Sequence, residues 1–179
     1  MADGDGRAPD GGRMVIRPYR ETDAQAVGRL IADTFSQFNL SSLMPEERGL
    51  LLGPFRHSGS IEPVHQEAIA RAIRSEMVFV AEVDGEIAGV LRGRTTRLGS
   101  LFVRGDYHRR GIGRMLVARF EQACVEQGGS AVKVAATVYA VPFYLAMGYK
   151  RTTGVRAYHA FGASGLRYQP MKKVLSNLS

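Results

Sequence analysis

The segment from Leu101 to Arg114 concentrates residue types that bind anions at the junction between an expected strand and an expected helix. The first N–H groups of a helix have no partner within it, and the helix dipole places positive charge there, so such a junction attracts phosphate. Glycine at 111 and 113 lets a diphosphate approach the backbone without meeting a Cβ. Three side chains add positive charge around the same turn: Arg109, Arg110 and Arg114. The segment therefore indicates a diphosphate site. The alternative is that the glycines only tighten the helix entry and the arginines form a solvated face.

The chain as a whole is basic, with a formal charge of +7, and arginine far outnumbers lysine. Such a surplus attracts nucleic acid, a nucleotide phosphate or an acidic substrate. A bias toward arginine codons would also produce it, so the charge alone does not choose among these. Because aromatic residues are not interleaved with the basic ones as a base-stacking surface requires, nucleic acid is not the expected partner.

Histidine and cysteine do not indicate a metal site, because His57, His65, His108 and His159 are scattered along the chain. Cys124 falls on the apolar face of an expected helix and is interpreted as core packing, not as a nucleophile. A single cysteine cannot form a disulfide within the chain, which favours a reducing, cytoplasmic location. The chain has no run of about 18 apolar residues and its start lacks the apolar core of a signal peptide, so no membrane segment is expected.

The elements that must position the turn follow from hydropathy patterns. Residues 14–16 form an apolar run ended by Pro18, which predicts a strand. Thr22 and Gln25 form a capping-box pattern ahead of an amphipathic helix that reaches Phe38. Residues 39–61 are expected to form a loop with short helical turns near a binding cleft.

Helix and strand signals then alternate along the chain. A helix is expected at 63–74, opened by Pro63, and the strands 77–83 and 86–94 flank Asp84-Gly85, which is a strong hairpin signal. The remaining expected elements are a strand at 98–103 with a bulge at Gly99, a helix at 111–127, a strand at 131–136, a short helix at 142–147, and strands at 149–153 and 166–174.

This order predicts an α/β (α+β) domain over residues 14–179, built on a mainly antiparallel sheet with one parallel crossover. Residues 1–13 are rich in Gly and Asp and are expected to form a disordered tail.

Residues 108–113, His-Arg-Arg-Gly-Ile-Gly, resemble the acyl-CoA signature of the GCN5-related N-acetyltransferase (GNAT) superfamily: Gln or Arg, two residues, Gly, one residue, then Gly or Ala. His108 departs from that signature. Residues 100–103 are similar to the family's fourth strand, whose main-chain groups pair with the pantetheine arm of CoA. The resemblance implies a three-layer fold with a mixed seven-stranded sheet and helices on both faces. It implies acetyl-CoA contacts at Leu101, Phe102, Val103, His108, Arg109, Arg110, Gly111, Ile112, Gly113 and Arg114.

Residues 136–149 resemble a second family motif, which has Ala, three residues and Tyr, and then Gly with an aromatic residue. The resemblance places Tyr144 beside the CoA sulfur, where its phenol would protonate the leaving thiolate. The alternative for Tyr144 is core packing. Thr137 stands near the point where many relatives have Asn, and it is expected to contact CoA. The general base stays open between Glu82 and a water held by Ser100 or by main-chain carbonyls, since residues 98–103 contain no Asp or Glu. A backbone N–H near Phe102 or Val103 would stabilise the tetrahedral intermediate.

The resemblance implies an enzyme that moves an acetyl group from acetyl-CoA to a primary amine by direct attack in a ternary complex. The second hypothesis is a binding module that senses acyl-CoA without turnover, and the third is a basic nucleic-acid binder. The expected partner is a small-molecule or peptide amine, with no membrane and no metal involved. The identity of the acceptor, the acyl-chain preference and a homodimeric state stay open.

Overall fold

Nine strands form one sheet in the part of the chain that the structure describes, residues 5–7, 12–160 and 163–176 of a computed structural model. Along the sheet the order is β1-β2-β3-β4-β5-β6-β9-β7, with β8 paired to β9, and only β5 and β6 run parallel. The strands are β1 (Asp5–Arg7), β2 (Arg13–Pro18), β3 (Met77–Val83), β4 (Glu86–Arg94), β5 (Arg97–Val103), β6 (Ala131–Thr137), β7 (Lys150–Arg151), β8 (Arg156–Ala160) and β9 (Ala163–Val174).

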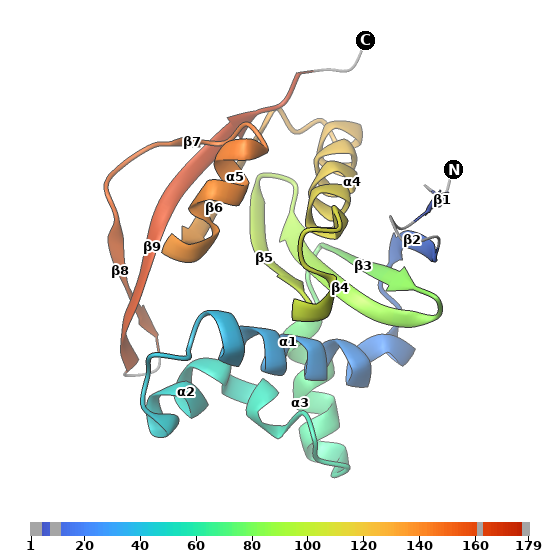
Figure 1. Ribbon diagram of the computed structural model, residues 1–179, viewed down its shortest axis with the longest axis vertical. Helices are drawn as coiled ribbons and strands as arrows, with labels where there is room; N and C mark the ends of the chain where they lie inside the picture. The colour runs from blue at the N-terminus through green and yellow to red at the C-terminus, as the bar shows by residue number, and fades with distance from the viewer. Residues whose placement is uncertain (1–4, 8–11, 161–162, 177–179) are drawn as a thin grey trace.

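Helices cover both faces of this sheet (Figure 1). They are α1 (Ala24–Phe38), α2 (Pro45–Leu52), α3 (Pro63–Ile73), α4 (Ile112–Glu126) and α5 (Val141–Ala146), with short 3-10 turns η1 (Glu21–Asp23), η2 (Gly53–His57), η3 (Gly105–Tyr107) and η4 (Val138–Ala140). The expected α/β class, with a mainly antiparallel sheet between helices, is confirmed. The expected number of seven strands is wrong, because β1 and β8 add two among the described residues. Both are short and carry no strong apolar alternation, so their pairing comes from a neighbouring backbone and not from their own pattern.

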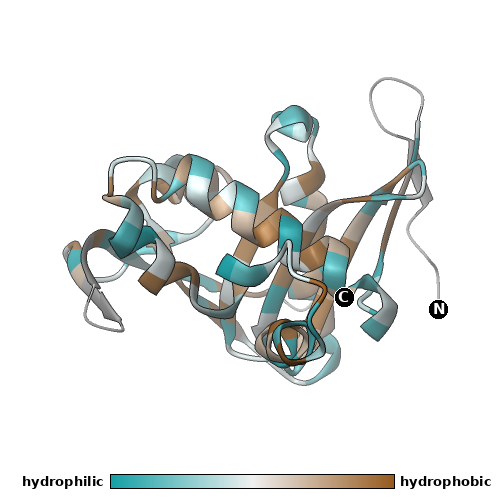
Figure 2. Ribbon diagram, turned by 90° about the horizontal axis from the view of Figure 1, so that it is seen from below, coloured by the Kyte–Doolittle hydropathy of each residue, from teal (hydrophilic) through white to brown (hydrophobic). Residues whose placement is uncertain are grey.

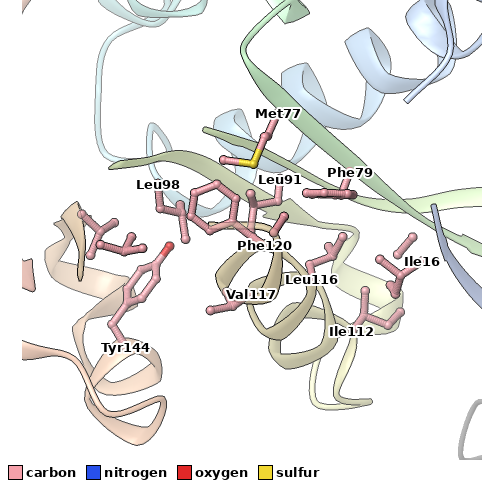
Figure 3. Close-up of a cluster of buried hydrophobic side chains, with 14 of the residues drawn as sticks. Ile16, Met77, Phe79, Leu91, Leu98, Ile112, Leu116, Val117, Phe120 and Tyr144 are labelled. Atoms are coloured by element: carbon pink, nitrogen blue, oxygen red, sulfur yellow. The ribbon is translucent and has the colours of Figure 1, made fainter. Parts of the chain in front are cut away.

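The two faces have separate cores. On β4, Leu91 faces α4 and joins a cluster with Leu116 and Phe120, while Val90 faces the other way and packs with Ile31 of α1 and Ile69 of α3. Figure 3 shows the first cluster, with side chains from α4 directed at the sheet. Teal and brown residues alternate along the helices in Figure 2, as expected for helices that bury one face. None of the described helices combines the length and apolar character that crossing a bilayer requires.

Local signals explain the β3–β4–β5 meander. Asp84 and Gly85 have φ of 50° and 86° and connect paired Val83 and Glu86, so this is a two-residue turn with both central residues in the left-handed region, and the predicted hairpin is confirmed. In β5, Leu98 pairs with Gly93 and Ser100 pairs with Arg92, which leaves Gly99 as the extra residue of a bulge. This expectation is also confirmed.

The predicted capping box at Thr22 and Gln25 is wrong. The chain forms η1 first, and α1 begins at Ala24. The Asp23 carboxylate accepts the Arg20 N–H at 2.8 Å and two hydrogen bonds from the Arg17 guanidinium at 2.8 and 2.9 Å. A charged acceptor with three donors is a stronger anchor than a threonine hydroxyl, so the start of the helix moves to it. Most of residues 1–13 lie outside the described residues, although Asp5–Arg7 are described as a strand paired with β2.

Candidate active site

A cavity of about 1230 Å³ runs through the sheet where β5 and β6 separate. These strands pair only at Arg97 with Lys133 and Leu98 with Val134, immediately before the bulge at Gly99. Beyond that point the remainder of β5 and residues 135–137 of β6 line opposite sides of the opening. Because the two strands are parallel neighbours that stop pairing, main-chain groups of β5 are left without a strand partner on that side.

The alternation of β5 shows which main-chain groups these are. Arg104 N–H donates to the Ala88 carbonyl on β4 at 2.9 Å, and Val90 pairs with Phe102. In a regular antiparallel pair, alternate residues point to alternate edges, so the Phe102 N–H faces β4. The N–H and C=O groups of Leu101 and Val103 face the opening. Of the two expected oxyanion donors, only Val103 has this orientation.

The turn after β5 has the backbone that the sequence suggested. Gly111 is the N-cap of α4 with φ of 81°, and Arg109 also has a positive φ of 62°. A Cβ added at Gly111 would meet no atom within 4 Å, so space in front of the helix N-terminus is open. Gly113 plays a different part from the expected one, because a Cβ there would lie 3.3 Å from the Phe143 ring. Glycine at 113 therefore lets α4 pack against α5.

The three arginines predicted to bind at this turn do not all line the cavity. Arg109 and Arg114 line the cavity, as do Ile112 and the two glycines. Arg110 is not among the lining residues, and its guanidinium lies 5.2 Å from the centre of the Tyr107 ring. His108 lines the cavity, and its Nε2 donates to the Val103 carbonyl at 2.7 Å.

Tyr144, on α5, is 4% exposed and lines the cavity. Its ring makes edge contacts with Phe143 and Tyr149 at centroid distances of 5.1 and 5.4 Å. Figure 3 shows the hydroxyl directed toward Leu98 of β5, which also lines the cavity. Burial raises the pKa of Tyr144, so its phenol stays protonated throughout the physiological range. Thr137, at the end of β6, lines the side of the opening across from β5.

No aspartate or glutamate occurs among the described residues that line the cavity. Glu82, one candidate base, is not a lining residue, and its carboxylate accepts hydrogen bonds from Arg17 Nε at 3.0 Å. Ser100 does line the cavity, and its Oγ accepts from Arg92 Nε at 2.9 Å. The geometry therefore excludes Glu82 as the general base, and a water held by Ser100 or by main-chain carbonyls stays the hypothesis.

Sequence reasoning missed the part of the cavity wall that α1 forms. Phe35 and Phe38 of α1 line the cavity, together with Leu51, Leu52, Gly53, Pro54 and Phe55, so the expectation that residues 39–61 lie near a cleft is confirmed. The aromatic residues of α1 carry the same helical spacing as core residues, so the sequence alone does not distinguish the two roles. Within the described part of the chain, no group of three or more His, Cys, Asp or Glu side chains is arranged to hold a metal ion.

The site suits a long anionic ligand and a second molecule together. The cavity exceeds the roughly 300–1,000 Å³ of pockets that hold one drug-sized ligand. One end has the open helix N-terminus with Arg109 and Arg114, which suits a diphosphate. The middle has the N–H and C=O groups of Leu101 and the N–H of Val103 without a strand partner, which suit an amide-containing arm, while the Val103 carbonyl accepts from His108.

Comparison with protein families gives a match to the acetyltransferase (GNAT) domain over residues 57–175. No curated protein sequence matches the chain. Three solved structures illustrate the similarity of fold. A GCN5-related N-acetyltransferase from Rhodopseudomonas palustris has a TM-score of 0.72 at 18% identity, over 98% of this chain and 100% of that one.

The PaiA N-acetyltransferase of Thermoplasma acidophilum, solved in complex with coenzyme A, has a TM-score of 0.61 at 15% identity, over 90% of this chain and 99% of its own. A ribosomal-protein-alanine N-acetyltransferase from Brucella melitensis has a TM-score of 0.58 at 20% identity, over 89% of this chain and 99% of its own. At these identities the structural neighbours establish the shared fold.

Proposed function

Since the chain belongs to the acetyltransferase (GNAT) domain family, we propose that it moves the acetyl group of acetyl-CoA to a primary amine by direct attack in a ternary complex. The observation that carries this proposal is the continuous cavity, which joins the helix N-terminus at Gly111 to the Tyr144 phenol through the separation of β5 and β6. In this proposal residues 14–179 form the acetyltransferase domain, and the enzyme works in the cytoplasm.

Binding of acetyl-CoA uses three parts of the chain. The first N–H groups of α4 and the side chains of Arg109 and Arg114 hold the diphosphate. The main-chain groups of Leu101 and the N–H of Val103 pair with the pantetheine arm as an added strand would. Thr137 contacts the arm from β6. The thioester then lies toward Tyr144 and Ser100.

The chemical step forms one bond and breaks one. The amine nitrogen attacks the thioester carbonyl carbon, and the oxygen that becomes negative accepts a hydrogen bond from a cleft-facing main-chain N–H at the thioester end of β5. The tetrahedral intermediate collapses, the C–S bond breaks, and Tyr144 O–H donates its proton to the leaving sulfur. The amide product keeps the acetyl group and the thiol leaves as CoA.

Loss of the amine proton needs no carboxylate of the enzyme in this proposal. Because the described lining contains no Asp or Glu, the acceptor reacts in its neutral form or loses its proton to water near Ser100. The lack of a carboxylate also keeps a second function in view, a sensor that binds acyl-CoA without turnover.

Thiol release measured with acetyl-CoA and a panel of primary amines separates the two functions. Release that depends on the acceptor, together with an acetylated product of the expected mass, supports the transferase. Acetyl-CoA bound tightly in calorimetry, with no release from any acceptor, supports the sensor and contradicts the transferase.

A further inference from the structure

Arg92 is an arginine inside the cavity that has no acidic partner. It lies on β4, is partly buried, and lines the cavity on the face covered by α1 and α3. Among the described residues, no carboxylate forms an ion pair or a hydrogen bond with it. Desolvation lowers the pKa of Arg92 and no opposite charge acts to raise it. A desolvated cation without an anion is costly, which points to an anion that arrives with a ligand.

The contacts that Arg92 does make orient its guanidinium without neutralising it. Nε donates to Ser100 Oγ at 2.9 Å, and Nη1 donates to the Ala72 carbonyl at 2.5 Å, in the last turn of α3. Cζ lies 5.6 Å from the centre of the Phe55 ring. The Nη2 donors have no hydrogen-bond partner among the described residues. Ser100 Oγ is an acceptor in this arrangement, so its own hydrogen remains able to donate.

The position of this pair along β5 separates it from the diphosphate end. Arg92 pairs with Ser100, three residues before Val103, which corresponds to about 10 Å of strand at about 3.3 Å per residue. A pantetheine arm that begins at the Gly111 turn and follows β5 ends its course near Ser100. Arg92 is therefore on the side where the acceptor meets the thioester, not on the side of the CoA phosphates.

The wall around Arg92 is apolar. Ile31, Phe35, Leu51, Pro54 and Phe55 line this side of the cavity. A ligand that fits must combine a negative group for Arg92 with an apolar body for these side chains. A polycationic acceptor fits poorly, because the described lining has arginines and no carboxylate.

We propose that Arg92 and Ser100 bind a carboxylate on the acceptor, and that the acceptor class is an amino acid with an apolar side chain. This proposal rests on the proposed acetyl transfer. The carboxylate accepts hydrogen bonds from Arg92 Nη2 and the Ser100 hydroxyl, and the side chain packs on Phe35 and Phe55. The amine then lies next to the thioester end of β5.

The test compares three acceptors that share the amine and the side chain of leucine: L-leucine, which has a carboxylate, and L-leucinamide and 3-methylbutylamine, which have none. For Arg92→Met, kcat/KM with leucine should fall about 100-fold, while values with the two acceptors without a carboxylate stay within about 3-fold of the unsubstituted enzyme. The ratio of variant to unsubstituted enzyme for each acceptor cancels differences in amine basicity. The KM for acetyl-CoA should not change. Arg94→Met is the matched control, since Arg94 is exposed on the same strand and outside the lining, and it should leave all three ratios near one.

Two further measurements keep the proposal open to refutation. Ser100→Ala should reduce kcat/KM for leucine about 5-fold more than it reduces kcat/KM for the two acceptors without a carboxylate. This difference tests the site if circular dichroism shows that Arg92→Met does not fold. Calorimetry should show that N-acetyl-leucine binds at least 10-fold more tightly than N-acetyl-leucinamide, and only when Arg92 is present.

Each contrary outcome has a distinct meaning. An equal loss with all three acceptors would assign Arg92 to the reaction itself and overturn the carboxylate site. Preference for leucinamide, with no binding of N-acetyl-leucine, would overturn the acceptor class while acetyl transfer stands. If no amine releases CoA, the transferase proposal fails, and the binding of N-acetyl-leucine still decides the carboxylate site.

Discussion

His108 Nε2 donates to the carbonyl oxygen of Val103 at 2.7 Å, at the point where the strand ends and the turn begins. That carbonyl faces the opening between β5 and β6, so the imidazole occupies the last acceptor of the strand. The His108 ring also lies 4.5 Å from the Phe38 ring of α1. His108, which departs from the family signature, thus connects β5, the turn that follows it and α1 at the edge of the cavity.

This relationship predicts the effect of His108→Ala. The substitution leaves the Val103 carbonyl without its donor and removes the contact with Phe38, so the turn should lose order. We expect the KM for acetyl-CoA to rise about 3- to 10-fold, with kcat reduced less than 3-fold. His108→Gln supplies an amide donor and should recover at least half of the lost affinity. Equal KM values for all three proteins would show that the imidazole has no part in CoA binding.

The role of Tyr144 is tested by Tyr144→Phe. Removing the phenolic oxygen should lower kcat about 10²- to 10⁴-fold, because the thiolate leaves without a proton donor, and acetyl-CoA affinity should stay within about 2-fold. Tyr149→Phe is a matched control. Tyr149 is 1% exposed, packs against Tyr144 and is outside the cavity lining, so its loss should leave kcat nearly unchanged. Unchanged turnover in Tyr144→Phe would remove this residue from the mechanism.

The helix N-terminus is tested at Gly111. Gly111→Asp places a negative charge before α4 and forces a side chain into φ of 81°, so the Kd for CoA should rise more than 100-fold. Gly111→Asn has a similar shape, tolerates positive φ and carries no charge, so its Kd should rise less than 10-fold. Equal losses in the two variants would assign the effect to backbone strain, and normal binding by Gly111→Asp would contradict the phosphate site.

Features determined by neighbouring residues could be predicted from the sequence, and features assembled from distant segments could not. The Asp84-Gly85 turn and the Gly99 bulge depend on backbone conformations that glycine favours locally, and both were predicted correctly. The start of α1 was not, because the Asp23 carboxylate is held by Arg17 of β2. The Arg92 site could not be predicted either, because it needs Ala72 of α3 and Phe55 of η2 beside one strand.

The pH dependence of the rate tests how the acceptor loses its proton. With no Asp or Glu among the described lining residues, kcat/KM should rise with unit slope up to the pKa of the acceptor amine itself. Acceptors with different amine pKa values should therefore give profiles displaced by the same difference. The raised pKa of Tyr144 adds no alkaline fall below about pH 10. Profiles that coincide for all acceptors would reveal a base belonging to the enzyme.

Buried groups that ionise at high pH predict a loss of stability there. Cys124 is 0% exposed, and burial raises its pKa from 9.0 to about 11. Above pH 9 the unfolded thiol loses its proton while the folded thiol keeps it, so the unfolded state binds fewer protons and the free energy of unfolding falls as pH rises. The stability contribution is complete below pH 9 and is lost progressively toward pH 11.

The buried phenols of Tyr144 and Tyr149, whose pKa values burial also raises, add to the loss above pH 10. Urea unfolding at pH 8 and pH 10.5 measures the fall, and Cys124→Ala should reduce it by about 2 kcal/mol, whatever its effect at pH 8. An identical fall in both proteins would show that the folded thiol ionises as freely as the unfolded one.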